Sequence, residues 1–466
     1  MKDPRSLIPS IDALLSGPDA ETMADEAGRD QVAKAFRTSV ADMRDAIVRG
    51  DEAVTQLVRD PSWYVRRARD VLAAASTPSL RRVVNATGVV LHTNLGRAPL
   101  APEALEAMKS AATYANLEFN LEEGERGSRY VHCVQLLCEL TGAEDALVVN
   151  NAAGALVLAM STVGHGRGVA VSRGELVEIG GGFRIPDVIE RSGASLVEVG
   201  STNRTRPDDY EAVIADGTAD AMLKVHRSNF RITGFTQEAS VQDLVEIGLR
   251  HGVRVVHDLG SGLMLPAESL GLPEEPRASL SIEAGADAVV VSGDKLMGGP
   301  QAGVIVGRRE LMEQMRSNPL CRALRVDKVT LAGLEATLRL YLDPARVASQ
   351  IPALRMLSVE ATELRRAADS ISTRLQAEGV SCSVVSTMGA VGGGTYPGVD
   401  LPSWAIELQD PEGAQSLAAR LRGGTPPIVG RIVDDRLRLD VRTLLHGEDE
   451  VLVAGVCEAL RGVRRP

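Results

Sequence analysis

The chain has 466 residues, more than a single hydrophobic core usually organises, so we expect two or three domains. Hydrophobic residues make up 44% and charged residues 24%, an ordinary globular composition that excludes a largely disordered protein. The formal net charge of −11 excludes a surface that is basic throughout, although local basic patches remain compatible with it.

Residues 1 to about 80 predict a small helical domain. Apolar residues recur there at helical spacing, and the clearest series is Val32, Phe36, Val40, Met43 and Ile47. Further along, arginines gather beside two aromatic residues: Trp63, Tyr64, Arg66, Arg67 and Arg69. This cluster is either a solvated helix face or an RNA-binding surface, and charge alone favours the solvated face.

Residues from about 140 to 307 predict an α/β domain with a mostly parallel sheet. Short β-branched runs alternate there with helical stretches, and the runs lie at 146–150, 168–172, 195–199, 222–226, 253–260, 288–295 and 302–307. One helical stretch, 241–252, ends on Gly252, as helices commonly do. Such alternation implies helices on both faces of the sheet and ligands at the carboxyl ends of its strands.

Residues after about 335 predict a second α+β domain. The stretch 346–380 has the pattern of one long helix. Short strands are expected around SCSVV, SWAIEL, PIVGRIV and RLRLDV, before a final helix over 449–463. The expected domains are therefore 1–80, 81–335 and 336–466.

A pyridoxal-phosphate (PLP) enzyme of the aspartate-aminotransferase fold, fold type I, needs three groups at the edge of its sheet. These are a cup for the phosphate, a carboxylate for the pyridine nitrogen and a lysine for the aldehyde. The candidate cup is a run of small residues that directly follows an apolar run and precedes a helical one. Backbone N–H groups at a helix start bind phosphate well, and the expected contacts are Asn151, Ala152, Ala153 and Gly154.

The candidate carboxylate and lysine follow two neighbouring apolar runs. Asp258 ends the run VRVVHD, where a bare buried charge is costly and a pyridinium N–H would be a suitable partner. Lys295 ends the run VVVSGDK, where burial lowers the pKa of a lysine and makes its amine a usable nucleophile. Ser292, three residues earlier, offers a hydroxyl to the phosphate. The cup, the carboxylate and the lysine occur in this chain order, and together they predict a PLP enzyme.

Five blocks of the sequence resemble those of the bacterial selenocysteine synthase family. They are RVVNATGVVLHTNLGRAPL (82–100), GELVEIGGGFRIPDV (174–188), KVHRSNFRITGF (224–235), HDLGSG (257–262) and SGDKLMGGPQAG (292–303). The resemblance runs from about residue 75 to the C-terminus, and the N-terminal helical region has the family's length and position. It implies that Lys295 forms a Schiff base with PLP, that Asp258 holds the pyridine nitrogen and that Asp294 lies beside the reacting centre.

The resemblance also identifies candidate residues for the second substrate. It implies that Arg97, Arg322 and Arg325 receive the anionic group of the selenium donor, and it adds His226 and Asn229 to the expected cofactor contacts. Arg322 and Arg325 are spaced i, i+3, so we expect them on one helical face that grips an anion.

The family's reaction implies further partners. Its members convert serine esterified to tRNA(Sec) into selenocysteine with selenophosphate, as a homodecamer built as a pentamer of dimers. Under this hypothesis residues 1–80 bind the tRNA, and no membrane is involved, because no apolar run reaches membrane-spanning length. Five cysteines without disulfide or CxxC spacing favour a cytoplasmic location, and the histidines show no spacing typical of a metal site.

Two alternative functions stay open. A PLP lyase acting on a small amino acid or a phosphorylated amino sugar would share the fold, although such relatives typically lack the N-terminal domain. A non-catalytic binding protein is disfavoured, because Asp258 and Lys295 are both retained. The residue that stacks on the PLP ring is also open: the region Ser172–Glu175 carries no aromatic residue, which leaves Arg173 or His226.

Overall fold

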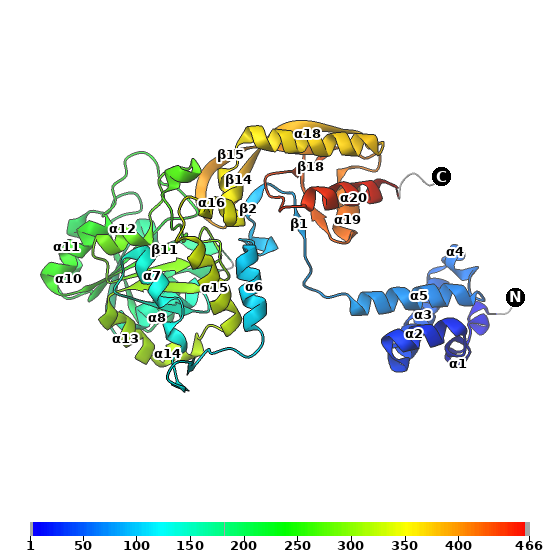
Figure 1. Ribbon diagram of the computed structural model, residues 1–466, viewed down its shortest axis with the longest axis horizontal. Helices are drawn as coiled ribbons and strands as arrows, with labels where there is room; N and C mark the ends of the chain where they lie inside the picture. Colours follow the sequence, from blue (N-terminus) through cyan, green and yellow to red (C-terminus); the bar gives the residue numbers. More distant parts are fainter. Residues whose placement is uncertain (1–2, 181, 462–466) are drawn as a thin grey trace. The chain divides into compact units, whose positions relative to one another are not determined.

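The computed structural model describes residues 3–180 and 182–461 (Figure 1). The chain divides into two compact units, Met1–Arg82 and Val83–Pro466. Among the described residues, no helix is both long and apolar enough to cross a membrane.

The N-terminal unit is a set of helices packed on the longest of them, α3. Its elements are η1 (Pro4–Leu7), α1 (Ile11–Leu15), α2 (Pro18–Ala27), α3 (Arg29–Arg49), α4 (Glu52–Thr55) and α5 (Pro61–Ser76). The predicted apolar series on α3 is buried from Val32 to Met43, with Ile47 partly buried. Gly50 ends α3 with a φ of +72°, a conformation that glycine adopts without strain. This unit therefore has a hydrophobic core of its own.

The second unit is built on a seven-stranded sheet with the order β5-β13-β12-β11-β10-β6-β9. Its strands are β5 (Asp145–Val149), β6 (Gly168–Ser172), β9 (Ser195–Val199), β10 (Ala221–Val225), β11 (Arg254–Gly260), β12 (Ala288–Ser292) and β13 (Gly303–Gly307). Neighbouring strands pair in parallel, except that β13 runs antiparallel to both β12 and β5. The predicted mostly parallel α/β sheet is confirmed, with all seven of its predicted strands.

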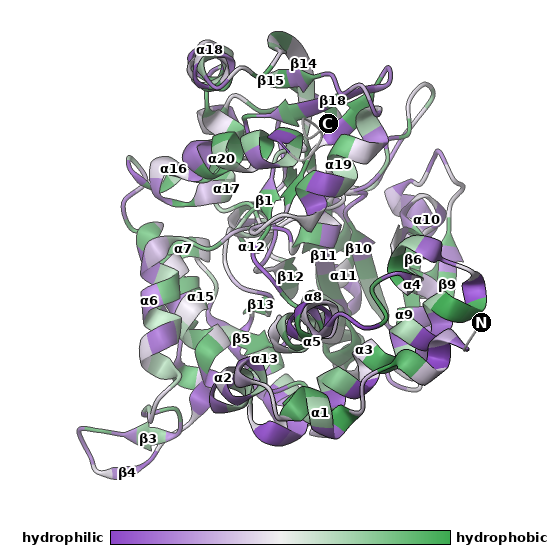
Figure 2. Ribbon diagram, turned by 90° about the vertical axis from the view of Figure 1, so that its right-hand side faces the viewer, coloured by the Kyte–Doolittle hydropathy of each residue, from purple (hydrophilic) through white to green (hydrophobic). Residues whose placement is uncertain are grey.

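Helices cover both faces of this sheet, because its strands are apolar on both sides. In β12, Ala288 and Val290 pack into one core cluster, while Val289 and Val291 pack into another. The first face is covered by α8 (Ala152–Val163), α9 (Ile185–Arg191) and α13 (Arg309–Ser317). The other is covered by α7 (Val134–Thr141), α10 (Pro207–Ala215), α11 (Val241–His251) and α12 (Ala278–Glu283). Figure 2 shows the hydrophobic colouring of strands of this sheet.

A second sheet of five strands has the order β17-β18-β15-β14-β2. Its strands are β2 (Val89–Leu91), β14 (Cys382–Gly392), β15 (Thr395–Leu408), β17 (Arg431–Val433) and β18 (Arg436–Asp440). The strand β2 comes from the start of the unit and pairs in parallel with β14. Beside it, β1 (Val84–Asn85) pairs in parallel with β16 (Ile428–Val429). Residues from the two ends of the unit therefore share one layer.

The stretch 346–380, expected to be one long helix, is three helices. They are α16 (Val347–Gln350), α17 (Pro352–Ser358) and α18 (Ala361–Ala377). Pro352 disfavours a helical conformation at Ile351, which is extended, so the helix stops and restarts there. The predicted final helix is confirmed as α20 (Glu448–Arg461), and residues 462–463 of that prediction lie outside the described part of the chain.

The remaining elements surround the two sheets. They are η2 (Thr93–Leu95), α6 (Pro102–Ala111), β3 (Phe119–Asn120), β4 (Glu125–Arg126), η3 (Arg129–Val131), η4 (Arg173–Glu175), β7 (Glu178–Gly180), β8 (Phe183–Arg184), η5 (Ala267–Leu270), α14 (Pro319–Ala323), α15 (Lys328–Leu340) and α19 (Ala414–Gly423). The strands β3 and β4 form a hairpin that projects from this unit (Figure 2).

Candidate active site

Asp258 and Lys295 follow neighbouring strands to the same edge of the large sheet. Asp258 pairs in register with Val290 of β12, and Lys295 lies just beyond the end of that strand. Both residues are buried, with exposed fractions of 7% and 6%. Both strands are buried by their apolar residues, and the side chains of Asp258 and Lys295 lie at the carboxyl edge of the sheet, where a ligand is expected.

A cavity of about 610 Å³ surrounds Lys295. Its lining includes these residues predicted for the site: Arg97, Asn151, Ala152, Ala153, Asp258, Ser292, Asp294 and Lys295. It also includes residues that sequence reasoning missed: Thr93, Asn94, Gly180, Phe183, Gly260 and Gln301. All of these missed residues belong to the five family-like blocks, which was the available signal. Gly154, His226, Asn229, Arg322 and Arg325 were also predicted, but they do not line the cavity.

The N-terminus of α8, where the phosphate cup is expected, lines one wall of the cavity. Asn151 is the N-cap residue, and its Oδ1 accepts a hydrogen bond of 2.7 Å from the Gly154 N–H. The N–H groups of Ala152 and Ala153 remain available to an anion. The neighbouring strand β13 can approach only because residue 303 is glycine: a Cβ there would lie 2.1 Å from the Asn151 carbonyl oxygen.

Neither side chain of the central pair, Asp258 and Lys295, forms a hydrogen bond or ion pair with any residue in the described ranges. Burial raises the pKa of the Asp258 carboxyl to about 6, although the Lys295 ammonium opposes the shift. Burial lowers the pKa of Lys295, which Asp258 partly offsets. A buried carboxylate that lacks a donor fits a pyridinium N–H, and a buried amine with a lowered pKa fits an aldehyde. The residues present therefore fit PLP.

Asp294 is held by two neighbours. The Ser292 hydroxyl donates to Oδ1 over 2.6 Å, and Nη1 of Arg97 donates to Oδ2 over 2.6 Å. Arg97 has a φ of +61°, which is strained for a residue with a side chain. The Ser292 hydroxyl hydrogen, which we expected to reach the phosphate, is already used, so only the oxygen lone pairs of Ser292 remain for another contact.

His226 and Asn229 lie in the segment that follows β10, next to the cavity lining. The backbone N–H of His226 donates to the Asp258 carbonyl oxygen over 2.9 Å. Burial lowers the pKa of the His226 imidazole to about 4, so the ring is neutral near pH 7. The Asn229 side chain donates to the Glu178 carbonyl oxygen over 2.7 Å and ties this segment to β7.

The aromatic ring in the cavity lining is Phe183 of β8. Arg173, one of the two residues considered for stacking, is exposed and held at the end of β9. Its Nε donates to Glu198 and its Nη1 to the Gly200 carbonyl oxygen, both over 2.9 Å. Arg173 and His226 are both outside the lining. Sequence reasoning stopped at Glu175 and so missed Phe183 in the same block.

Arg322 and Arg325 do not share a helical face, contrary to the expectation from their spacing. The helix α14 ends at Ala323, between the two residues. The residues after α14 pair with the end of β5. Arg325 forms a β-bridge with Val149, and the Asn150 N–H donates to the Leu324 carbonyl oxygen over 3.0 Å.

The arginine and aromatic cluster of the N-terminal unit is mostly engaged within that unit. Tyr64 is fully buried, and its hydroxyl donates to the Val58 carbonyl oxygen over 2.9 Å. The Trp63 ring meets it edge-on, with a centroid distance of 5.0 Å. The arginines form ion pairs with aspartates, at 3.8 Å for Arg66–Asp60, 2.6 Å for Arg67–Asp42 and 2.6 Å for Arg69–Asp19. These contacts support the interpretation as a solvated, structural helix face.

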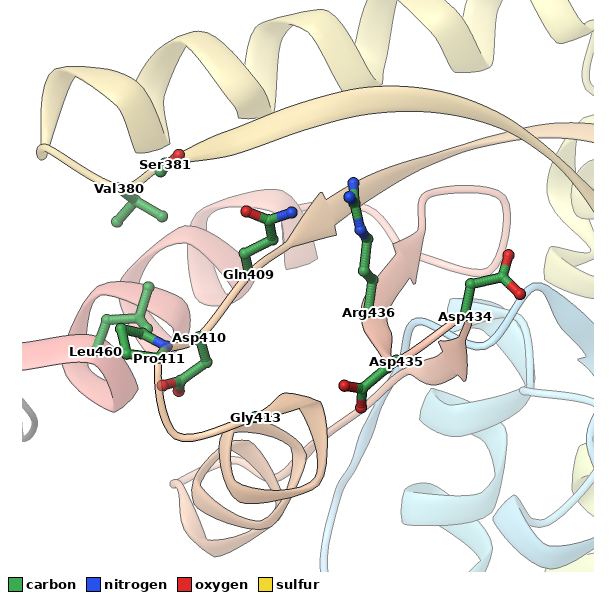
Figure 3. A pocket seen from close by; sticks show the side chains of 10 residues that line it. All are labelled: Val380, Ser381, Gln409, Asp410, Pro411, Gly413, Asp434, Asp435, Arg436 and Leu460. Atoms are coloured by element: carbon green, nitrogen blue, oxygen red, sulfur yellow. The ribbon is translucent and has the colours of Figure 1, made fainter.

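A second cavity, of about 650 Å³, lies in the C-terminal part of the chain (Figure 3). Asp434 and Asp435 of the β17–β18 turn and Asp410 contribute to its lining. Asp410 is paired with Arg420, and the lining residue Arg436 donates to Glu407 over 2.7 Å. None of the residues predicted for catalysis lines this cavity.

Comparison with known proteins gives a consistent result. The family model described as L-seryl-tRNA selenium transferase matches residues 83–445, and that of the selenocysteine synthase N terminal matches residues 5–44. L-seryl-tRNA(Sec) selenium transferase of Moorella thermoacetica is 47% identical over 460 residues, 98% of this chain and 97% of that protein. The enzyme of the same name from Carboxydothermus hydrogenoformans is 45% identical over 445 residues, 95% of this chain and 94% of that protein.

A solved structure with the same fold is that of D-glucosaminate-6-phosphate ammonia-lyase. It matches with a TM-score of 0.58 and 23% identity, over 83% of this chain and 97% of that chain. The predicted fold class is thereby confirmed. The family model covers most of the chain, and the relatives match nearly its whole length, so the chain belongs to the L-seryl-tRNA selenium transferase family.

Proposed function

We propose that the protein is a PLP-dependent enzyme that converts serine esterified to tRNA(Sec) into selenocysteine, with selenophosphate as the selenium donor. One observation carries the proposal: Asp258 and Lys295 line one cavity with the N-terminus of α8, and neither side chain has a partner among the residues described. The names of relatives that are 45% and 47% identical over almost the whole chain support the choice of substrate.

The cofactor would be held at three points of the cavity. The N–H groups of Ala152 and Ala153 would bind its phosphate, Asp258 its ring nitrogen and Lys295 its aldehyde. When bound, PLP supplies an electron sink for the bond broken at Cα. Phe183 offers the ring that lines the same cavity.

The protein residues then move and hold protons. The free amine of Lys295 would take the Cα proton of the seryl group, a role that suits an amine whose pKa is lowered by burial. Asp258 keeps a proton on the ring nitrogen. The proton taken by Lys295 would pass to the β-hydroxyl, which would leave as water. Selenium of the donor would then bond to Cβ while a proton returns to Cα, and water would cleave the Se–P bond and release phosphate. Arg97, which donates to Asp294 and lines the cavity beside Lys295, would orient the anionic donor.

The N-terminal unit would bind the tRNA through α3 rather than through the arginines of α5. Lys34, Arg37 and Arg44 are exposed and lie on one face of α3. None of them forms an ion pair or a side-chain hydrogen bond with another described residue. Unpaired cations are available to RNA phosphates, whereas Arg67 and Arg69 are already paired.

The working enzyme would be a cytoplasmic homo-oligomer, a decamer by family resemblance. The segment that contains the β3–β4 hairpin supports association, because it exposes several large apolar side chains: Tyr114, Phe119, Leu121 and Val131. Arg322 and Arg325, which do not line the cavity of their own chain, would meet the selenium donor only if assembly brings them to a site.

The test is incubation of the purified protein with PLP and seryl-tRNA(Sec), with and without selenophosphate, followed by identification of the esterified amino acid. Selenocysteine is expected only when selenophosphate is present. Lys295→Ala should lose both this activity and the PLP that borohydride fixes to the chain, whereas Lys109→Ala, at an exposed position, should keep both. Recovery of unchanged serine in every wild-type reaction would overturn the proposal.

A further inference from the structure

A buried polar cluster beside Asp258 and Lys295 has no part in the proposed reaction. It consists of His226, Ser261, Glu275 and Tyr396, which come from the ends of β10 and β11, the loop before α12 and the start of β15. Ser261, Glu275 and Tyr396 have exposed fractions of 0%, 6% and 3%. Each of the four side chains has a buried polar atom without a hydrogen-bond partner among the described residues: His226 Nδ1, Ser261 Oγ, Glu275 Oε1 and Tyr396 OH.

Buried polar atoms without partners are uncommon, because losing water without gaining a hydrogen bond is costly. In this cluster two of the atoms already face each other: His226 Nδ1 lies 3.8 Å from Glu275 Oε1. An approach of less than about 1 Å would make this a hydrogen bond. The carboxylate of Glu275 is therefore poised to accept the Nδ1 proton of a neutral His226.

The cluster is attached to both central residues through the backbone. The His226 N–H donates to the Asp258 carbonyl oxygen over 2.9 Å. The N–H of Leu296, the residue after Lys295, donates to the Ser261 carbonyl oxygen over 3.0 Å. The backbone at His226 and Ser261 is thus tied to the backbone at the residues that would hold the cofactor.

Glu275 also acts on Lys295 through its charge. Burial raises the pKa of Glu275 to about 6, and the Ser261 hydroxyl, Lys295 and Arg231 oppose the shift. The carboxylate is therefore mostly ionised near pH 7. Its negative charge raises the pKa of Lys295, as do Asp258 and Asp294, while burial and Arg97 lower it. Tyr396 of β15 is uncharged near pH 7, because burial raises its pKa, and the negative charge of Glu275 acts in the same direction.

We propose that Glu275 is a positioning residue of the Lys295 site, which holds His226 through a hydrogen bond to Nδ1 and adds a second buried negative charge near Lys295. The inference rests on the proposed function, because it concerns a chain that holds PLP on Lys295.

The test is the pH titration of the absorbance of PLP attached to the chain, which needs no tRNA. In Glu275→Gln, removal of the negative charge should move the midpoint to lower pH by about one unit. Glu274→Gln, at the exposed neighbouring position, is the matched control and should titrate like the wild type. Ser261→Ala should move the midpoint in the same direction by less, because Glu275 loses a group that favours its ionised form.

The outcomes separate this inference from the proposed function. If the wild type attaches PLP but Glu275→Gln and Ser261→Ala both titrate like it, Glu275 has no such role. If Glu275→Gln does not fold, an unchanged midpoint in Ser261→Ala is enough to reject the inference. A wild-type chain that attaches no PLP would reject the inference together with the proposed function.

Discussion

Arg97 donates a hydrogen bond from Nη1 to Oδ2 of Asp294 over 2.6 Å, and Asp294 is the residue directly before Lys295. Arg97 follows β2 of the five-stranded sheet, whereas Asp294 follows β12 of the seven-stranded sheet. The Ala98 N–H adds a second link, to the Asp294 carbonyl oxygen over 3.2 Å. The two sheets therefore meet at the residue next to the proposed catalytic lysine.

Loss of this link should damage catalysis more than cofactor binding. Arg97→Ala should still attach PLP through Lys295, but turnover should fall by about 100-fold or more, because Asp294 and the donor lose their orienting partner. Arg173→Ala removes an arginine that is paired outside the cavity, so its turnover should stay near that of the wild type. Steady-state kinetics together with a PLP content assay check both expectations, and wild-type turnover in Arg97→Ala would contradict the first.

Asp258 should make the PLP-free protein less stable above pH 6. The pKa of its carboxyl is raised from 3.8 to about 6 by burial, so the folded protein binds this proton more tightly than the unfolded chain does. Stability is then lost as the pH rises from about 4 to 6, where the buried carboxylate ionises. PLP-free Asp258→Asn should be more stable than the PLP-free wild type by roughly 1–3 kcal/mol at pH 8.

The sign of this difference can be checked by denaturant unfolding at several pH values. The advantage of Asp258→Asn should shrink below pH 6 and vanish near pH 4, where both side chains are neutral. With PLP bound, the ring nitrogen should stabilise the Asp258 carboxylate, so the advantage should disappear at pH 8 as well. A variant less stable than the wild type at pH 8 without PLP would show that the carboxylate has a stabilising partner there.

The cations of α3 should matter for RNA more than those of α5. In the full chain, Arg37→Ala with Arg44→Ala should weaken binding of tRNA(Sec) and lower the slope of log K against log salt by roughly 1.5–2. The paired arginines provide the control: Arg66→Ala with Arg69→Ala should change the slope little. Filter binding at several salt concentrations measures both. If Arg66→Ala with Arg69→Ala weakened tRNA binding more than the α3 variants do, the RNA-binding surface would lie on α5 instead.

Arg322 and Arg325 should act after the hydroxyl has left. Arg322→Ala and Arg325→Ala are expected to leave tRNA that carries the dehydrated amino acid, because an anion grip is needed only when selenium adds. The esterified products can be identified by mass spectrometry after hydrolysis. If both variants instead return unchanged serine, these arginines serve the cofactor or the tRNA and not the donor.

The positions of the strand ends could be predicted because the apolar runs in the sequence coincide with the buried strands of the sheet. An apolar run that ends in Asp258 or Lys295 gives both the strand and the polar group at its end, and the sheet order then brings the groups together. The large-sheet strands and the core of α3 were predictable for the same reason, since the apolar runs of the strands and the helical spacing along α3 mark the side chains that are buried.

The remaining differences come from contacts between distant parts of the chain. Tyr64 belongs to the core of the N-terminal unit, which the spacing of residues along α5 does not reveal. Phe183 lies on β8, which pairs antiparallel with β7, and this pairing places it at the cavity. Arg325 leaves its expected helix because Val149, far earlier in the chain, pairs with it. None of these partners can be inferred from local sequence.

The pairing of β1 with β16 and of β2 with β14 also constrains how the chain is made. On the ribosome, the N-terminal unit can fold early, because its core residues are all close in sequence. The next strands must wait until residues near 390 and 428 have emerged, so the small sheet cannot close before those residues are made. A chain released before Ile428 would leave β1 without its partner strand β16. Unpaired strand edges favour aggregation, so we expect such incomplete chains to be degraded and not to accumulate.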